Sequence, residues 1–357
     1  MDTVTQIALG ASVGQLVAGR TLGPKAMVYG AVGGLLPDLD VFLGSDEPLA
    51  EWKYHRGMTH SLWFGPVVGT ALGWLGWKLA RWRKPDSPSA GDDALKTWIL
   101  LWVLTIFTHP LLDLFTVYGT QLLAPFSRER FAIPGVPIID PVYTLILLAG
   151  LVAAGIFGVR TRKAVVASGV ALALTTSYLI FGWGQNARAE NLARASLAAQ
   201  GANPESVSAY TTMFSIFLRR IVATEPDKYR IGFVSTLNPQ PIEWRVVKRN
   251  SNATTLAEVA LVTPDGKAYR KFASGPLFAE IGEASGERVL RLHDMRFGMP
   301  GSSLTGIWGA QWPINGNRTL ATVSRFTNRP SFDRPGAAWN FVVQTYRAAF
   351  GLPVSSF

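Results

Sequence analysis

Residues 97–118 have the sequence TWILLWVLTIFTHPLLDLFTVY, which is apolar except for His109 and Asp113. A stretch of this length and composition is typical of a helix that spans a membrane. An ionisable group inside such a helix costs about 2.5–3.5 kcal/mol on insertion scales, so it is normally paired and functional. His109 and Asp113 are four positions apart and therefore lie on the same helical face, one turn apart. The stretch predicts a membrane helix that carries part of a polar centre.

Other stretches before residue 185 share this apolar character. The hydrophobic fraction of the chain is 48% and the charged fraction is 16%, whereas a soluble domain usually carries about 25% charged residues. Three further stretches have the length and apolarity of spanning helices, and two earlier, glycine-rich stretches are weaker candidates. They are 61–80, 137–159 and 164–184, and then 4–19 and 26–36. We therefore expect an α-helical membrane domain of about six membrane segments.

Lysine and arginine residues gather in the connections after the first, third and fifth predicted segments. With six segments these connections lie on one side, and the positive-inside rule makes that side cytoplasmic. The chain after residue 184 then faces outward, so we expect a multi-pass protein with a periplasmic or extracellular C-terminal domain. The net charge of +10 fits contact with membrane lipids. No basic helix, zinc finger or aromatic RNA-binding signature indicates a nucleic-acid partner.

The character of the sequence changes after residue 184. We expect a helical membrane domain over 1–184 that carries the polar centre, a connecting helix over 185–205, and a small β-rich extramembrane domain over 206–357. Short alternating runs, separated by Pro, Gly, Asn and Asp, predict the strands of this last domain. The runs are 217–222, 229–234, 242–247, 257–262 and 288–292.

Ionisable side chains of the membrane half occur in four motifs: LPDLD at 36–40, HRGMTHS at 55–61, THPLLD at 108–113 and Asp140-Pro141. In the first motif Pro37 breaks the helix, and the two carboxylates could bracket one cation. In the second, Gly57 permits a turn that brings two imidazoles to one point. The chain has no cysteine, so a metal site must use His, carboxylates or water. The candidate metal ligands are Asp38, Asp40, His55, His60, His109 and Asp113.

These ligands predict a metal cofactor and a reaction class. Imidazole with carboxylate suits zinc first, with manganese or iron as alternatives, and so many ligands could hold one or two divalent ions. A bound metal lowers the pKa of its water to about 7 and so supplies hydroxide at neutral pH. We expect metal-dependent hydrolysis of a lipid-like substrate at the outer membrane face, with a phosphoester as the leading candidate. Arg56, Arg128 or Arg130 would neutralise the phosphate, and Asp140 would be the general base.

Each residue also has a purely structural interpretation. His109 and Asp113 could form an intramembrane hydrogen bond, and Asp38 and Asp40 could simply end a helix. The three arginines could extend to lipid headgroups, and Asp140 before a proline is typical of a helix N-cap. The clustering of three histidines with three aspartates favours a functional centre. The second functional hypothesis is a non-enzymatic membrane protein, either a metal or proton transporter or a scaffold that binds a regulator.

Together, the motifs MDTVTQ at 1–6, LPDLD, HRGMTHS and THPLLD resemble those of a bacterial family of membrane-bound metal-dependent hydrolases. That family is also described as LexA-binding, inner-membrane-associated hydrolases of YdjM type. The resemblance covers residues 1–185 and implies an inner-membrane location, a metal-dependent hydrolase activity, the six ligand positions above and a regulatory protein partner. One departure is Thr5-Gln6, where some members have Thr-His. Either this site has one ligand fewer, or Gln6 supplies a carbonyl oxygen.

Overall fold

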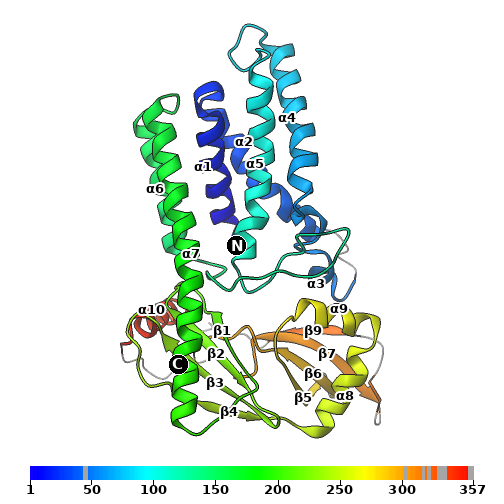
Figure 1. The fold of residues 1–357 in the computed structure, drawn as a ribbon. Coiled ribbons are helices and arrows are strands. Elements are labelled where there is room, and N and C mark those ends of the chain that lie inside the picture. The colour runs from blue at the N-terminus through cyan, green and yellow to red at the C-terminus, as the bar shows by residue number, and fades with distance from the viewer. Residues whose placement is uncertain (43–46, 301–303, 316–317, 320–322, 328–335, 353–357) are drawn as a thin grey trace. The chain divides into compact units, whose positions relative to one another are not determined.

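A computed structural model describes residues 1–42, 47–300, 304–315, 318–319, 323–327 and 336–352 of the protein (Figure 1). The chain divides into two compact units. Unit 1 comprises residues 1–43, 54–133 and 138–181, and unit 2 comprises residues 44–53, 134–137 and 182–357. The predicted boundaries at 184 and 205 are not tested by this division and stay a prediction.

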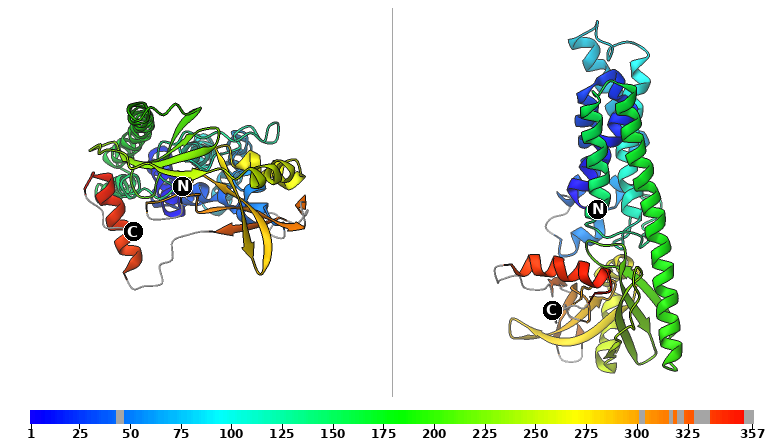
Figure 2. Two further views of the ribbon diagram at one scale, coloured as in Figure 1. Left: turned by 90° about the horizontal axis from the view of Figure 1, so that it is seen from below. Right: turned by 90° about the vertical axis from the view of Figure 1, so that its left-hand side faces the viewer.

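Unit 1 is helical, and its long helices lie side by side as a bundle (Figures 1 and 2). They are α1 (Thr3–Leu22), α2 (Pro24–Leu35), α4 (Phe64–Arg83), α5 (Ala94–Leu114), α6 (Pro141–Ile156) and the first part of α7 (Arg162–Ala199). Two short 3-10 helices, η1 (Leu36–Phe42) and η2 (Met58–His60), complete unit 1, and most of α3 (Ala50–Tyr54) belongs to unit 2. Asp2 caps α1 by accepting a hydrogen bond from the Thr5 amide, which satisfies one of the free donors at the helix start.

Glycines set the spacing between α1 and α2. A Cβ atom added at Gly10 would lie 2.2 Å from the Gly30 carbonyl oxygen, and one added at Gly14 would lie 2.2 Å from the Ala26 carbonyl oxygen. The two backbones therefore touch where a larger side chain has no room, as in closely packed membrane helices. This contact brings the end of α2, and η1 after it, next to the start of α1.

The six predicted segments fold as helices, but the prediction of six membrane segments is wrong. Among the described residues, two helices, α5 and α7, are long and apolar enough to cross a membrane, judged by length and composition alone. A span needs about 20 residues, whereas α2 has 12 and α6 has 16. α1 and α4 have 20 residues each, but glycines and polar side chains dilute their apolar character. The orientation rested on the six-segment count, so a multi-pass topology with an outward C-terminal domain has no support here.

Unit 2 contains two antiparallel sheets. The four-stranded sheet has the order β1 (Ser206–Thr211), β2 (Leu218–Thr224), β3 (Lys228–Ser235) and β4 (Arg245–Lys248). The five-stranded sheet has the order β5 (Leu277–Ala284), β6 (Glu287–Asp294), β7 (Trp308–Asn315) and β8 (Arg318–Thr319), and β9 (Ser324–Thr327) also pairs with β7. Besides most of α3 and the last part of α7, the described part of unit 2 contains the helices α8 (Ser251–Leu261), α9 (Pro264–Phe272) and α10 (Ala337–Ala349).

The β-rich character of this unit agrees with the sequence prediction except over 257–262. Four of the five predicted runs overlap β2, β3, β4 and β6, whereas 257–262 lies mostly in α8. The Asn250 side chain caps α8 by accepting from the Ala253 amide. Ala253, Ala257 and Ala260 are buried at spacings of four and three, which is the helical period. An apolar run this short could not distinguish a strand from a helix.

A fully buried arginine ties three segments of unit 2 together. The Arg219 guanidinium donates to the carbonyl oxygens of Pro134, Gly135 and Gly182, each at 2.8 Å. It also donates to the Ile216 carbonyl at 2.9 Å and to the Asn186 side-chain oxygen at 3.3 Å. These contacts replace the water that a buried cation loses.

Candidate metal centre

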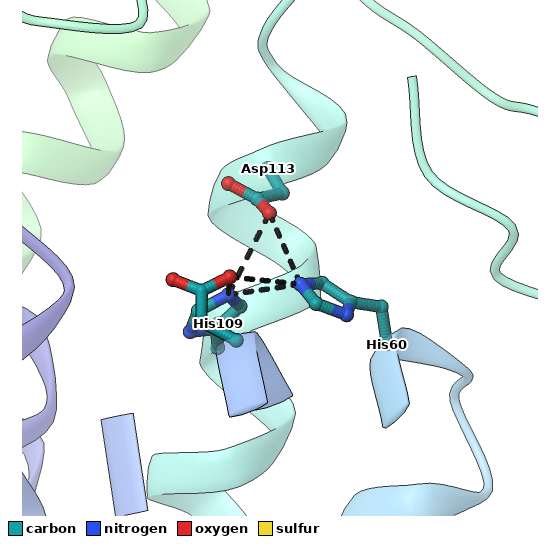
Figure 3. A group of neighbouring side chains, drawn as sticks. His60, His109 and Asp113 are labelled. Atoms are coloured by element: carbon teal, nitrogen blue, oxygen red, sulfur yellow. Dashed lines mark hydrogen bonds and ion pairs between the residues drawn. The ribbon is translucent and has the colours of Figure 1, made fainter. Parts of the chain in front are cut away.

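Four ionisable side chains of unit 1 converge at one point (Figure 3). Asp38 comes from η1, His60 from η2, and His109 and Asp113 from α5. Each offers one ligand atom, and these four atoms all lie within 4.8 Å of one another. The i, i+4 spacing on α5 places the last two on one face, as the sequence predicts.

The closest approach is between the two imidazoles. His60 Nε2 lies 3.1 Å from His109 Nε2. Asp38 Oδ1 is 3.4 Å from His60 Nε2 and 3.3 Å from His109 Nε2. Asp113 Oδ2 is 3.4 Å and 3.6 Å from the same two nitrogens. The side chains of His60 and His109 are fully buried, whereas that of Asp38 is 24% exposed, so the cluster is most open on the Asp38 side.

The other nitrogen of each imidazole is held by an acceptor, which decides the tautomer. His109 Nδ1 lies 2.6 Å from the Gly34 carbonyl oxygen, which can only accept. His60 Nδ1 lies 3.1 Å from Asp40 Oδ2. Both Nδ1 atoms therefore carry the hydrogen, and in the neutral rings both Nε2 atoms present lone pairs to the same point. Two lone pairs and two carboxylate oxygens that face each other attract positive charge, which either a proton on Nε2 or a metal ion could supply.

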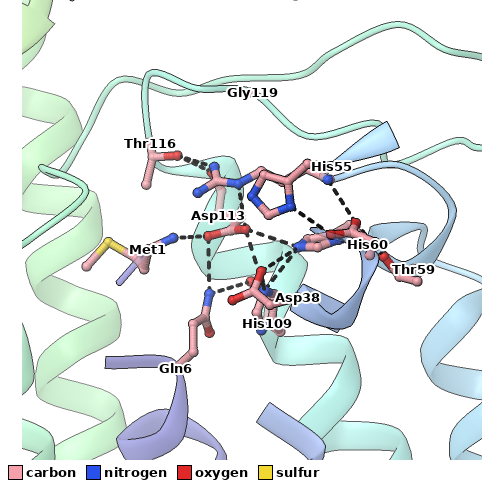
Figure 4. A network of polar contacts seen from close by, with 12 residues as sticks. Met1, Gln6, Asp38, His55, Thr59, His60, His109, Asp113, Thr116 and Gly119 are labelled. Atoms are coloured by element: carbon pink, nitrogen blue, oxygen red, sulfur yellow. Dashed lines mark hydrogen bonds and ion pairs between the residues drawn. The ribbon is translucent and has the colours of Figure 1, made fainter. Parts of the chain in front are cut away.

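The cluster lies within a wider network of polar contacts that includes His55 and Thr59 (Figure 4). Asp40 connects these two residues to the Nδ1 side of His60. Its Oδ1 lies 2.7 Å from His55 Nδ1, and its Oδ2 accepts from the Arg56 amide at 3.0 Å and from the Thr59 hydroxyl at 2.7 Å. The sequence predicts Asp40 and His55 as metal ligands, but the structure places both outside the group of four. Their contacts are those of residues that orient a ligating imidazole.

Arg56 is buried beside the cluster rather than extended to headgroups. Its Nε lies 3.0 Å from Asp113 Oδ2, and its Nη1 donates to the Thr116 hydroxyl at 2.6 Å. The guanidinium also stacks 4.7 Å from the centre of the Tyr118 ring. Arg56 has φ +58°, a conformation that costs a non-glycine residue about 1–3 kcal/mol and is found mostly at functional sites. The surrounding contacts hold the residue in this unfavourable conformation.

Gln6, which the sequence offers as an alternative ligand through its carbonyl oxygen, is a buried neighbour of the cluster. Its Nε2 donates to Asp113 Oδ1 at 3.1 Å and lies 3.5 Å from the His109 carbonyl oxygen. Its Oε1 is buried and accepts no hydrogen bond in the described part of the chain. The Met1 amino nitrogen also contacts Asp113 Oδ1. The departure at Thr5-Gln6 was the sequence signal that pointed to this position.

The other predicted site residues, Arg128, Arg130 and Asp140, are not part of the cluster of four. Arg128 is exposed, and no hydrogen bond or ion pair that the structure describes joins it to the cluster. Arg130 donates to the carbonyl oxygens of His55 and Gly119, both at 2.9 Å, and so holds the loop behind the centre. Asp140 is the N-cap of α6: it accepts from the Tyr143 amide at 3.1 Å and from the Tyr178 hydroxyl at 2.9 Å. These contacts favour the capping alternative, and the catalytic role of Asp140 stays a prediction.

The ionisable side chains of η1 and η2 shift one another's pKa values. Burial alone would raise the pKa of Asp38, but hydrogen bonds with His109 and His60 hold that pKa far below its usual value. Hydrogen bonds with His55 and His60 likewise outweigh burial and lower the pKa of Asp40. Burial opposes a charged imidazole, yet Asp113, Asp38 and Asp40 together raise the pKa of His60 to about 9. The cluster thus attracts positive charge, either protons or a metal ion.

The helical unit and its buried cluster define a class of membrane-associated protein with a His/Asp group that could hold a metal ion. The chain belongs to the YdjM inner membrane protein family, whose model matches residues 1–186. This family membership was predicted from the four motifs and is confirmed.

Two curated relatives support the assignment. The chain is 32% identical over 135 residues to the inner membrane protein YbcI of Escherichia coli (strain K12), covering 37% of this chain and 71% of YbcI. It is 28% identical over 165 residues to uncharacterized protein YfhP of Bacillus subtilis (strain 168), covering 42% of this chain and 45% of YfhP. The chain thus spans less than half of the length of YfhP. No solved structure matches the chain.

Proposed function

We propose that the protein is a metal-dependent hydrolase of the inner membrane, with Asp38, His60, His109 and Asp113 as the metal ligands. The observation that carries this proposal is the convergence of four acceptor atoms within 4.8 Å, two of them imidazole nitrogens whose tautomers are set by Gly34 and Asp40. Each residue contributes one ligand atom, which favours one ion over two. Two imidazoles and two carboxylates suit zinc first, with manganese or iron next.

The residues around the cluster have roles that follow from their contacts. A divalent ion held there would supply Lewis acidity and a hydroxide nucleophile at neutral pH. Asp40 keeps His60 Nε2 directed at the ligand point, and the Gly34 carbonyl does the same for His109. Arg56 provides a buried positive charge that suits a phosphoester whose negative charge increases during reaction. The partial exposure of Asp38 gives the side from which water and substrate approach.

Exposed apolar residues beside the site favour a lipid-like substrate. Within η1, Leu39 and Phe42 are 54% and 77% exposed. Trp63, just after η2, is 55% exposed and contacts the exposed Phe126, with ring centroids 6.2 Å apart. Apolar side chains grouped at the rim of a polar site are what a substrate with acyl chains needs. A phosphoester of a membrane lipid is therefore the substrate class that we propose.

Metal content tests the first part of this proposal. We expect about one equivalent of zinc, manganese or iron in detergent-purified wild-type protein by elemental mass spectrometry, and loss of that metal in His60→Ala and Asp113→Ala. His293→Gln is the matched control, because His293 lies in β6 of unit 2. Metal-free wild-type protein that also fails to bind added metal would refute the metal centre.

Hydrolysis tests the second part. We expect the metal-loaded protein to release product from a panel of phospholipid and lysophospholipid phosphoesters in mixed micelles, and the His60→Ala protein to release none. Loaded wild-type protein without activity on any member of the panel would contradict the hydrolase and favour a non-enzymatic metal transporter or scaffold. The two tests fail separately, because metal binding does not require turnover.

A further inference from the structure

Unit 2 contains a cavity of about 750 Å³ that is lined by its own residues. The volume lies within the range of about 300–1,000 Å³ that small-molecule sites occupy. The lining comes from β1, β2 and β3 of the four-stranded sheet, from α8 and α9, from residues around the start of β5, and from β6. Nothing in the proposed hydrolase accounts for this cavity.

One part of the lining is a row of hydroxyl groups. Ser206 of β1 is paired in register with Thr224 of β2, which is paired with Tyr229 of β3. Residues in register across a sheet share a face, and so do residues two apart along a strand. Ser208 therefore joins the same face as Ser206, and all four line the cavity.

Two arginines add positive charge to the lining, Arg249 after β4 and Arg270 on α9. The Arg249 guanidinium lies 4.6 Å from the centre of the Tyr229 ring, and its buried Nε donates to no acceptor among the described residues. In the described ranges no carboxylate forms an ion pair with either arginine. Glu258 is the acidic residue of the lining, so two positive charges stand against one negative charge.

Apolar side chains complete the cavity. They come from α8, β5 and β6, and they are Ala257, Leu261, Leu277, Phe278 and Leu292. The cavity thus joins a basic, hydroxyl-rich surface to an apolar one. A ligand that satisfies both surfaces has an anionic head and a compact apolar body.

We propose that this cavity is a binding site for a phosphate monoester that carries a small apolar group. Arginine guanidinium groups bind phosphate oxygens in pairs of parallel hydrogen bonds. The serine and threonine hydroxyls supply further donors to a tetrahedral group with several acceptor oxygens. The apolar lining then accommodates the organic part of the ester, which distinguishes it from free phosphate.

Isothermal titration calorimetry on the full-length protein in detergent, with a metal chelator present, tests this site. The chelator separates the cavity from the metal centre. The probes are n-butyl phosphate, inorganic phosphate and butanoate. We expect n-butyl phosphate to bind, inorganic phosphate to bind at least about tenfold more weakly, and butanoate to bind more weakly than n-butyl phosphate.

Three variants connect the binding to the cavity. Arg249→Gln and Arg270→Gln should each weaken n-butyl phosphate binding by about tenfold or more, because each removes a charge-assisted hydrogen-bond donor. Arg270 is exposed, so its variant tests the site without disturbing folding. Arg288→Gln, an exposed arginine of β6 outside the lining, should bind like the wild type.

The proposal is overturned if none of the probes binds, or if both cavity variants bind as the wild type does. Butanoate binding as tight as that of n-butyl phosphate would overturn phosphate as the ligand class. Inorganic phosphate binding as tight as that of n-butyl phosphate would overturn the role of the apolar lining. Binding unchanged in His60→Ala, with the same loss in Arg270→Gln, would support a site independent of the metal centre.

Discussion

The buried centre depends on which atom each side chain presents. Asp38 and Asp40 are two positions apart in the sequence. An oxygen of Asp38 faces the Nε2 atoms of both His60 and His109. Asp40 instead contacts His60 Nδ1, the Arg56 amide and the Thr59 hydroxyl. A carboxylate that accepts from Nδ1 fixes the ring orientation and increases the basicity of Nε2. The two aspartates therefore have different tasks in spite of their identical chemistry.

Replacing Asp40 with asparagine tests this division. Asp40→Asn keeps the shape but offers His60 Nδ1 a neutral acceptor, so we expect metal affinity to fall by about 10–100-fold without complete loss of the site. Competition with a chromophoric chelator measures the affinity. Asp92→Asn is the control, because Asp92 is an exposed residue paired with Arg81. Complete loss of metal, as in Asp113→Ala, would instead make Asp40 a direct ligand.

At the scale of elements, the packing of α1 on α2 positions η1 and hence Asp38. A Cβ at Gly30 would meet the Gly10 carbonyl oxygen at 2.2 Å, which neither backbone can avoid without shifting. We expect Gly30→Ala to destabilise the protein by about 1–3 kcal/mol. Gly184 of α7 has open space around it, so Gly184→Ala should be neutral or stabilise by up to about 1 kcal/mol.

Thermal unfolding in detergent, followed by circular dichroism, measures both glycine variants side by side. A Gly30→Ala protein that unfolds at the wild-type temperature would show that α1 and α2 can move apart freely. The close approach of the two backbones would then contribute nothing to the free energy of unfolding.

The start of α6 offers a test of Asp140. Asparagine is as good an N-cap as aspartate, but it cannot act as a base. We expect Asp140→Asn to keep wild-type stability and hydrolysis, and Asp140→Ala to lose about 1 kcal/mol of stability. Hydrolysis assays and thermal unfolding of the two variants provide the measurements. A stable Asp140→Asn protein without activity would restore the general base that the sequence predicts.

The sequence located the helices well because the apolar stretches coincide with whole helices, but it overestimated the number of membrane spans. The stretch 137–159 joins the capping turn before α6, α6 itself and the residues after it, whereas the helix has 16 residues. The motifs could predict that His and Asp side chains form the cluster, since His109 and Asp113 share a helix face. The supporting roles of Asp40 and His55 were not, because they depend on which ring nitrogen faces the centre.

At the scale of the whole molecule, a metal bound only by folded unit 1 should stabilise the protein by mass action. At a free metal concentration about 100 times the dissociation constant, the gain is about 2.7 kcal/mol. We expect zinc to raise the unfolding temperature of the wild type after chelator treatment, and to leave that of His60→Ala unchanged. Differential scanning fluorimetry measures the shift. An equal shift in both proteins would place the stabilising metal elsewhere.

The Arg219 contacts have a consequence for the response of unit 2 to acid. Its five described acceptors are amide oxygens, three of which come from residues 134, 135 and 182. Amide oxygens do not take up protons as carboxylates do when the pH falls. The contacts of Arg219 with residues 134 and 135 should therefore survive acidification that protonates a carboxylate such as Glu225, whose pKa is lowered by its pairing with Arg230. In mild acid the guanidinium hydrogens of Arg219 should therefore exchange with solvent more slowly than those of Arg230, which donates to Glu225.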